Sequence, residues 1–416
     1  MRILVLGINY APEIISTAVY TCGLAEDLAA RGHDVSVIAA VPYFPAWKRM
    51  AGWAQGWRHE RRGGVEVMHC PLYVPARPTG VRRVLHHASF ALAALPVALW
   101  QAVRWRPDMV FVVAPSLISA PVGWLAARLA GAKVWLHIQD FEVEAAFATG
   151  LLRAQSCLGR AAMVFERWAL RRFDRVSSIS APMVDRLRAK GVPFERLCEL
   201  RNWANVAAVT PLEGPSPLRR ELGISTPHVV LYSGNLANKQ GLEILPEVAR
   251  RLAHRADLTF AICGEGPMRD DLLRRSAGLA AIRFFPLQPL DKLSVLLGMA
   301  DVHLLPQIAG AADLMLPSKL TNMLASGRPV VATADPATAL GREIDGCGIL
   351  TPPGDAGAMA TAIEALLDAP DARARLGAAA RQRAIWRWDG QAILAGLEGE
   401  FTRLVASAPY SAVAKP

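Results

Sequence analysis

The segment 314–333, LMLPSKLTNMLASGRPVVAT, has residue types in an order that suits anion binding. Pro317 and Ser318 are typical of the first turn of a helix, and Gly327 is typical of its end. That first turn has unpaired backbone N–H groups and the positive end of the helix dipole, which together attract phosphate. Lys319 lies in the same turn, where a cation is favourable only beside an anion. The pattern predicts a phosphate site, and a solvated loop lysine is the alternative.

A second loop of the phosphate type lies earlier in the same half of the chain. Residues 234–241 read GNLANKQG, after an apolar run and before a helical pattern. Gly234 allows the backbone to approach a ligand closely, and Lys239 supplies a cation at the start of the helix. The next apolar run ends in CGEGP at 263–267, which suits another strand-to-helix turn. The loop 234–241 is therefore a second candidate for phosphate binding.

The amino half has polar residues at the ends of predicted strands but no dinucleotide-binding fingerprint. His137 ends an apolar run, and the carboxyl end of a parallel strand is where ligands bind in such sheets. A hydrogen-bonded structural histidine is the alternative. The segment 9–13, NYAPE, lies at the same kind of edge after the first run. Gly7 has no partner glycines at the required spacing, which disfavours an NAD site.

The elements that must position these residues alternate along almost the whole chain. Short apolar runs alternate with amphipathic stretches, a rhythm typical of parallel βα units with helices on both faces of a sheet. At 416 residues the chain is long enough for two domains, and the Pro-containing stretch 210–217 is the expected linker. We expect strands at 3–7, 34–39, 108–113, 134–137, 175–180, 229–233, 258–263, 282–287, 302–305 and 330–333. We expect helices at 17–31, 181–190, from 356 onward and at 390–404.

The formal net charge of +10 lies entirely in the amino half. Residues 1–205 contain 25 Lys or Arg against 15 Asp or Glu, whereas residues 206–416 contain 21 of each. Aromatic and basic residues alternate in 41–62, which suits a membrane interface or stacking on single-stranded nucleic acid. A loop held on the domain by its aromatic rings is the third interpretation. Charge alone leaves nucleic acid, an anionic membrane and an acidic substrate open.

The apolar segment 88–100 is flanked by arginines on both sides. It is shorter than the roughly 20 residues that span a bilayer and contains Pro96. It is either a surface helix lying on a bilayer or a core helix of the α/β layer. The six cysteines have no close pair, which indicates reduced thiols and neither a disulfide framework nor a zinc site.

Taken together, these motifs resemble family 4 glycosyltransferases of GT-B architecture, similar to those of colanic-acid and O-antigen-type exopolysaccharide biosynthesis. The resemblance is carried by the loop with Gly234 and Lys239, CGEGP, the block 317–331, GLAEDLAARGHDVSVIA at 23–39 and HIQD at 137–140. It implies two Rossmann-like doubly wound domains facing across a cleft. The implied division is an acceptor-binding domain at 1–205, a nucleotide-sugar-binding domain at 206–385, a helix at 386–405 that packs back on the amino-terminal domain, and a disordered tail at 406–416.

The resemblance also implies an activity. It is transfer of a sugar, with retention, from a nucleoside diphosphate sugar to a polyprenyl-diphosphate-linked saccharide. The nucleotide sugar is a co-substrate, no cofactor or metal is expected, and the sequence has no Asp-x-Asp pair for a divalent ion. The implied location is the cytoplasm, peripheral on an anionic membrane surface at the inner face of the plasma membrane, with no nucleic acid partner.

The resemblance assigns roles residue by residue. His137 and Lys239 are the implied catalytic residues. The implied donor-binding residues are Gly234, Asn235, Lys239, Gly264, Glu265, Phe285, Leu287, Asp313, Pro317, Ser318, Lys319 and Asn322. The implied acceptor-binding residues are Tyr10, Pro12, Glu13, Thr17 and Asp140. Many relatives have two glutamates eight positions apart where this chain has Leu314 and Asn322, with Asp313 as the neighbouring carboxylate.

Three other functions remain open at this point. A sugar-nucleotide epimerase shares the architecture but needs no acceptor. A non-catalytic, membrane-bound partner of a polysaccharide assembly complex is favoured by Leu314 and Asn322. A nucleic-acid-binding protein is the least favoured, because the basic half has no recognised binding module.

Overall fold

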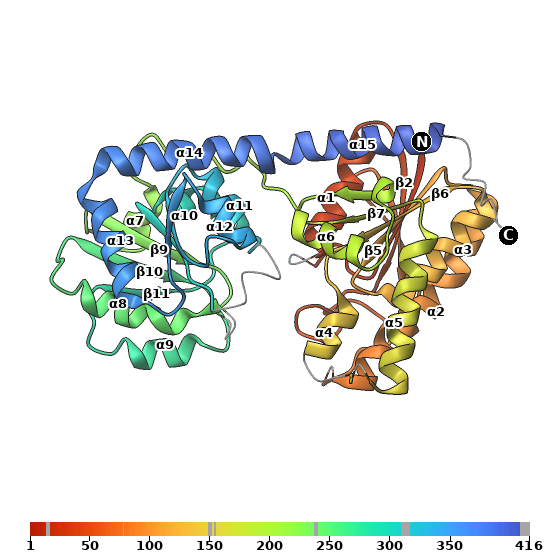
Figure 1. The fold of residues 1–416 in the computed structure, drawn as a ribbon, viewed down its shortest axis with the longest axis horizontal. Coiled ribbons are helices and arrows are strands. Elements are labelled where there is room, and N and C mark those ends of the chain that lie inside the picture. The colour runs from red at the N-terminus through yellow and green to blue at the C-terminus, as the bar shows by residue number, and fades with distance from the viewer. Residues whose placement is uncertain are drawn as a thin grey trace. The chain divides into compact units, whose positions relative to one another are not determined.

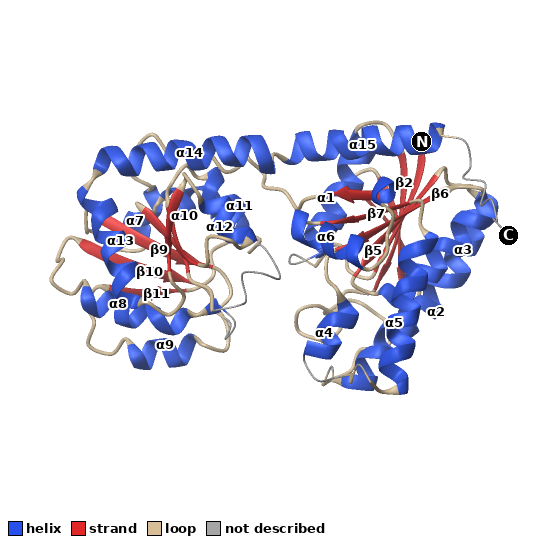
Figure 2. Cartoon of the chain, in the orientation of Figure 1, coloured by secondary structure: helices blue, strands red, loops and turns tan. Residues whose placement is uncertain are grey.

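The computed structural model describes residues 1–13, 17–77, 79–148, 152–153, 155–236, 240–308 and 317–407. The chain divides into two compact units. The amino-terminal unit comprises Met1–Arg201 with Gln391–Pro416, and the carboxyl-terminal unit comprises Asn202–Gly390. Each unit is a mainly parallel sheet with helices around it, so the predicted α/β class is confirmed (Figures 1 and 2).

In the described part of the amino-terminal unit, eight strands form one sheet in the order β3-β4-β2-β1-β5-β6-β7-β8. All neighbouring pairs are parallel except β3 with β4. The strands are β1 Arg2–Gly7, β2 Asp34–Ala40, β3 Arg58–Arg62, β4 Val65–Cys70, β5 Met109–Ala114, β6 Lys133–Ile138, β7 Arg175–Ser178 and β8 Leu197–Glu199. The helices of this unit are α1 Thr17–Ala30, α2 Gly80–Arg104, α3 Ala120–Ala130, α4 Glu142–Ala148, α5 Cys157–Arg172, α6 Ala181–Ala189 and α15 Gly390–Ala406.

Both faces of this sheet are covered, as the near-continuous apolar strands require. On one face Val110 and Val112 of β5 join a core cluster with Phe90 of α2. The intervening Phe111 points to the other face, where its ring lies 5.6 Å from that of Phe401 on α15. Alternation along the strand therefore separates a layer under α2 from a layer under α15.

In the described part of the carboxyl-terminal unit, six strands form a fully parallel sheet in the order β11-β10-β9-β12-β13-β14. They are β9 His228–Ser233, β10 Leu258–Cys263, β11 Ile282–Phe285, β12 Val302–Leu305, β13 Val330–Thr333 and β14 Gly348–Thr351. The helices are α7 Pro217–Glu221, α8 Leu245–Arg251, α9 Arg269–Arg275, α10 Leu293–Gly298, α11 Lys319–Ala325, α12 Ala339–Ile344, α13 Ala356–Asp368 and α14 Pro370–Trp388. The sheet changes winding direction between β9 and β12, where ligands bind in doubly wound folds.

Helix α2 differs most from its sequence-based prediction. It runs from Gly80 to Arg104, well beyond 88–100, and Pro96 lies inside it on the exposed side. Proline removes one backbone hydrogen bond from a helix. Packing of Phe90 and Ala94 against the sheet outweighs that loss.

The aromatic and basic segment 41–62 is mostly a loop packed on the domain. Tyr43 is buried, and Trp47 and Trp53 pack against the core cluster. Trp57 is exposed, and its indole N–H donates to the Ala93 carbonyl of α2 at 3.1 Å. The third interpretation of this segment therefore fits most of its aromatic residues.

Some predictions fall on residues outside those described. These are the site residues Lys239 and Asp313, together with Leu314. The predicted tail 406–416 lies outside the described residues from 408 onward.

Candidate active site

Two glycine turns pack directly on each other at the carboxyl edge of the carboxyl-terminal sheet. Gly234 follows β9, Gly264 follows β10, and the Gly234 N–H donates to the Cys263 carbonyl at 2.9 Å. A Cβ added to Gly264 would lie 1.9 Å from the Gly234 carbonyl oxygen, and one on Gly266 would lie 2.5 Å from that of Leu236. Glycine is therefore required for this backbone packing.

Lys319, the first residue of α11, points at these turns. Its Nζ donates to the Tyr232 hydroxyl at 2.7 Å and to Gln240 Oε1 at 3.2 Å. The same Nζ lies 4.1 Å from the centroid of the Tyr232 ring and 3.4 Å from the position of a Cβ on Gly234. Sequence reasoning placed the lysine here but missed Tyr232 and Gln240, which reach it from distant positions in the chain.

The charge of Lys319 is not neutralised within the described part of the chain. None of the ion pairs found there includes it, and its two partners are uncharged oxygens. Burial lowers the pKa of Lys319 to about 7. A desolvated ammonium without a counter-ion at a ligand-binding edge is suited to an anionic ligand.

The other predicted donor-binding residues near Lys319 differ in how exposed their side chains are. Ser318 occupies the N-cap position of α11 with an exposed side chain that makes no capping hydrogen bond, and Pro317 and Asn322 are partly buried. Asn235 borders the glycine turns, with its Oδ1 2.7 Å from a Cβ built on Gly266.

Near the glycine turns, the end of β11 and the segment after it offer backbone groups more than side chains. The Phe285 side chain is buried in the core, and its carbonyl accepts from the Gly264 N–H at 3.1 Å. Leu287 is exposed. Glu265 forms an ion pair with Arg269 at 3.4 Å, and its carbonyl accepts from the Leu236 N–H at 2.8 Å.

His137 is buried at the carboxyl end of β6 in the amino-terminal unit. Its Nδ1 is 2.9 Å from the Ser177 hydroxyl, and its ring stacks on Phe111 with centroids 5.8 Å apart. Burial lowers the pKa of His137 to about 3, so the imidazole is neutral at pH 7. A neutral imidazole can donate or accept a hydrogen bond without adding charge.

The acceptor candidates of the loop after β1 are largely occupied by structural contacts. Glu13 accepts from the backbone N–H groups of Tyr43 and Phe44, each at 2.8 Å, and from Asn9 Nδ2 at 2.8 Å. Tyr10 is buried, and the Thr17 carbonyl accepts from the Thr21 hydroxyl at 2.9 Å. Pro12, between them in sequence, is partly buried. Glu13 therefore orders the loop that follows β2.

A polar cluster that the sequence did not reveal lies beside Asp140. Glu142 accepts from the backbone N–H groups of Ser116 and Leu117 at 2.9 and 2.5 Å, and its Oε1 is 3.7 Å from His87 Nε2. Burial, reinforced by the charge of Glu142, raises the pKa of Asp140. Among the described residues neither ring nitrogen of His87 has a hydrogen-bond partner. The only sequence signal was the position of Glu142, two residues after HIQD.

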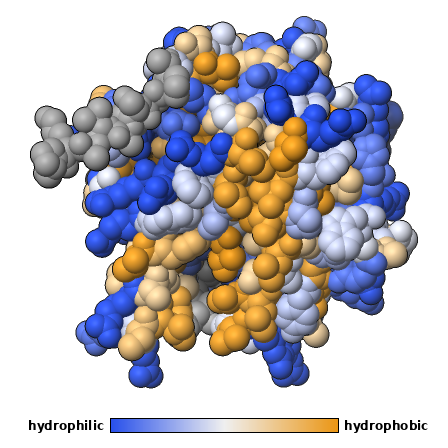
Figure 3. All heavy atoms as spheres, turned by 90° about the vertical axis from the view of Figure 1, so that its right-hand side faces the viewer, coloured by the Kyte–Doolittle hydropathy of each residue, from blue (hydrophilic) through white to orange (hydrophobic). Residues whose placement is uncertain are grey.

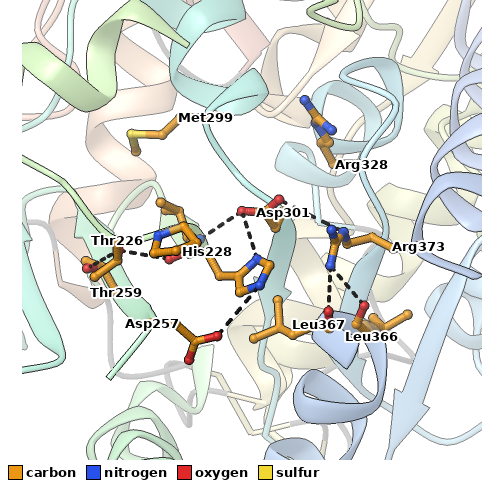
Figure 4. Close-up of polar contacts among 12 residues, drawn as sticks. Thr226, His228, Asp257, Thr259, Met299, Asp301, Arg328, Leu366, Leu367 and Arg373 are labelled. Atoms are coloured by element: carbon orange, nitrogen blue, oxygen red, sulfur yellow. Dashed lines mark hydrogen bonds and ion pairs between the residues drawn. The ribbon is translucent and has the colours of Figure 1, made fainter. Parts of the chain in front are cut away.

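A second polar network, at the amino edge of the carboxyl-terminal sheet, is structural (Figure 4). Asp301 accepts from the Val229 N–H at 2.9 Å and from Arg219 Nη2 at 2.7 Å. The imidazole of His228 lies between Asp301 and Asp257, at 4.0 and 3.7 Å. These contacts tie the starts of β9, β10 and β12 together at the edge opposite Lys319.

Within the described ranges, no group of three or more His, Cys, Asp or Glu residues is arranged to hold a metal ion.

Known proteins share the sequence features of both units. Residues 17–203 match the family described as "Glycosyl transferase 4-like domain", and residues 227–369 match "Glycosyl transferases group 1". The chain is 42% identical over 350 residues to the "Putative colanic acid biosynthesis glycosyl transferase WcaI" of Escherichia coli K12, covering 82% of this chain and 85% of that protein. It is 26% identical over 422 residues to a glycogen synthase of Mycobacterium tuberculosis, and the alignment covers 94% of this chain and 92% of that protein.

Solved structures share the fold at low sequence identity. Sucrose-phosphate synthase from Thermosynechococcus elongatus aligns with a TM-score of 0.74 and 19% identity, over 98% of this chain and 100% of that chain. Anabaena HepE in complex with UDP aligns with a TM-score of 0.70 and 16% identity, over 97% of this chain and 100% of that chain. The fold is the GT-B fold of two Rossmann-like domains. The chain belongs to the glycosyltransferases that combine a family 4-like domain with a group 1 domain.

Proposed function

We propose that this enzyme transfers a sugar, with retention, from a nucleoside diphosphate sugar to a polyprenyl-diphosphate-linked saccharide in exopolysaccharide assembly. The observation that carries the proposal is the desolvated ammonium of Lys319 beside the packed glycine turns. A relative at 42% identity is named for colanic acid biosynthesis, and HepE, which shares the fold, has been solved with UDP and with UDP-glucose. Both support a nucleotide sugar as the donor.

The chemical barrier is separation of an oxocarbenium-like sugar from a departing nucleoside diphosphate. Cations and N–H groups fixed in place before the reaction stabilise that leaving group. Lys319 provides one such cation, held by Tyr232 and Gln240, and Lys239 provides a second. We expect Lys239→Ala to lose at least about 2–3 kcal/mol of transition-state stabilisation.

In this proposal the acceptor binds the amino-terminal unit. The carboxyl groups of Asp140 and Glu142 are suited to hydrogen-bonding sugar hydroxyls, because their oxygens accept hydrogen bonds. Neutral His137 donates a hydrogen bond to the transferring sugar. The basic surface of the unit favours a diphosphate-linked acceptor and an anionic membrane, so the enzyme works as a peripheral protein at the cytoplasmic face of the plasma membrane.

The proposed reaction proceeds without a metal ion, because the two lysines supply the positive charge. Transfer is therefore expected to continue in the presence of EDTA. A loss of activity that Mg²⁺ or Mn²⁺ restores would contradict this part of the proposal.

The test is a panel of UDP- and GDP-sugars, first for binding by thermal shift and then for transfer to a membrane extract. We expect at least one nucleotide sugar to raise the melting temperature and to label a lipid-linked saccharide. Conversion of one nucleotide sugar into another in the absence of an acceptor would indicate an epimerase. Absence of binding across the panel would indicate a non-catalytic partner.

A further inference from the structure

Helix α2 has two apolar faces, of which the sheet covers one. Phe90, Ala94 and Ala98 are buried in the core cluster. The opposite side exposes large apolar residues at helical spacing, each 50–71% accessible: Val81, Val84, Leu85, Leu92, Trp100 and Val103. Residues three and four apart share one side of a helix, so these side chains form a stripe along the whole of α2.

The apolar surface continues onto the neighbouring helices. Helix α3 packs on α2 and on α5, and Trp124 of α3 meets Trp168 of α5 edge to face at 5.8 Å. The exposed large apolar residues of these two helices are Leu125, Leu129, Leu158 and Val164. The space-filling view of this side of the molecule shows a band of apolar residues edged by hydrophilic ones (Figure 3). A contiguous exposed patch of this kind marks a surface that binds something.

The charges around the patch identify an anionic partner. Helices α2, α3 and α5 contain three, one and four arginines, respectively. The single acidic residue in their sequences is Glu166, which is buried and bonded to Lys190 at 2.7 Å. Helices that expose an apolar stripe and arginines, and whose one acidic residue is buried, are complementary to an anionic lipid surface.

The geometry of α2 favours lying on a bilayer over crossing it. By length and composition α2 could span a membrane, and it is the one such helix found in the described ranges, but 39% of its most apolar stretch is buried against the domain. Its covered side carries polar groups bonded into the domain. His86 Nδ1 bonds the Tyr73 carbonyl at 2.6 Å, and Gln101 Nε2 donates to the Ser36 hydroxyl at 2.9 Å. Crossing would break these bonds and move the polar groups into hydrocarbon, where each costs several kcal/mol.

We propose that the exposed stripe of α2, with the adjoining residues of α3 and α5, is a docking face for an anionic lipid bilayer, on which α2 lies flat. The stripe from Val81 to Val103 is about 33 Å long at 1.5 Å per residue. This inference rests on the proposed function for the reason to dock, a lipid-linked acceptor at an anionic membrane, and adds the face that docks.

The test is sedimentation of the full chain with vesicles of phosphatidylcholine, with and without 30% phosphatidylglycerol. We expect binding to the anionic vesicles and at least tenfold weaker binding of Leu92→Glu/Val103→Glu, because the new carboxylates oppose both the apolar and the charge contact. The matched control is Leu290→Glu, at an 80% exposed leucine of the carboxyl-terminal unit, which should bind like the wild type. Arg82→Gln/Arg104→Gln should reduce the preference for phosphatidylglycerol.

Three outcomes would overturn the proposal. The double glutamate variant could bind vesicles as tightly as the wild type. The wild type could fail to bind anionic vesicles. The same substitutions could convert a dimer to a monomer in gel filtration without changing lipid binding, which would make a second copy the occupant. The thermal shift with nucleotide sugars is measured in parallel, so that loss of fold or of donor binding is distinguished from loss of docking.

Discussion

At the scale of single residues, the position of Lys319 could be predicted and its environment could not. The helix punctuation of Pro317, Ser318 and Gly327 located the lysine at the start of α11. Its contact with Tyr232 joins residues 87 positions apart, a separation over which a single sequence gives no signal. Glu142 was missed for the same reason, because its partners Ser116 and Leu117 lie about 25 positions earlier, at the start of a short 3-10 helix after β5.

Substitution of Lys319 should separate function from stability. In Lys319→Met the nucleotide-induced thermal shift should disappear and transfer should fall about 10²–10³-fold, because the leaving group loses a cation. The melting temperature of the ligand-free protein should stay at least as high as that of the wild type, because a desolvated charge without a counter-ion has been removed. The measurements are thermal shift with and without UDP-sugar, and initial transfer rates.

Lys292→Met is the control for that substitution. Lys292 pairs with Glu221 at the surface of the same unit, so its loss should leave binding and transfer unchanged. Normal transfer by Lys319→Met would exclude the assigned role.

His303 should make folding stability depend on pH in a defined window. It is buried on β12 with its Nε2 3.0 Å from the Ser326 hydroxyl, and burial lowers its pKa to about 3. Below about pH 6.5 the unfolded chain binds a proton that the folded state does not, so stability falls as the pH decreases. When the pH falls from 7 to 5, His303 should lower the free energy of unfolding by about 2 kcal/mol.

Urea unfolding of the wild type and of His303→Gln at the two pH values measures that contribution. The difference in unfolding free energy between pH 7 and 5 should be about 2 kcal/mol smaller in the variant. Equal pH dependence in both proteins would mean that His303 accepts a proton in the folded state.

At the scale of elements, local patterns predicted ten of the fourteen strands in the described residues, missed β3, β4, β8 and β14, and predicted α2 poorly. The strands at 258–263, 302–305 and 330–333 have the predicted bounds, because each is a short apolar run ended by a turn. The strand predicted at 282–287 ends at Phe285, before Pro286, which lacks an N–H for the sheet. The apolar run 88–100 marked only the middle of α2, which extends to Gly80 and Arg104 through ends that contain arginine, histidine and glutamine. Propensity is a weak signal wherever tertiary packing opposes it.

The packed glycine turns provide a test at this scale. In Gly264→Ala the new Cβ would meet the Gly234 carbonyl oxygen at 1.9 Å, so the two turns must move apart. We expect a loss of stability of several kcal/mol, in the range of severe overpacking, and loss of nucleotide binding. Gly396→Ala is the control, because nothing lies within 4 Å of a Cβ there and alanine favours the helix by about 0.5–1 kcal/mol. Wild-type melting behaviour of Gly264→Ala would contradict the observed packing.

At the scale of the whole molecule, the charge asymmetry was visible in the sequence but its surface was not. The excess of basic residues in 1–205 indicated an anionic partner without naming a face. The docking face becomes evident only when α2, α3 and α5 are seen together, because each helix alone is an ordinary amphipathic segment. A core helix and a membrane-docking helix need the same kinds of apolar residue, so the sequence of α2 alone does not distinguish them.

Hydrogen exchange should show two independent surfaces. A UDP- or GDP-sugar that binds should protect the turns at 233–236 and 263–267 and the helix α11, because its phosphates contact them. Anionic vesicles should protect α2 and leave those turns unchanged. Mass spectrometry of peptic peptides would measure both patterns in one protein. Protection of α2 by the nucleotide alone would contradict the separation of the two surfaces.

If a nucleoside diphosphate is the counter-ion of Lys319, its binding must change the protonation of that lysine, which calorimetry measures. With a pKa of about 7, Lys319 is mostly neutral at pH 8.5 in the ligand-free protein, so binding of UDP should take up close to one proton. Titration of UDP in buffers of different ionisation enthalpy measures that uptake, with Lys319→Met as the reference. We predict uptake in the wild type and none in the variant. Tight binding of UDP with no proton uptake in either protein would show that Lys319 is not the cation paired with the diphosphate.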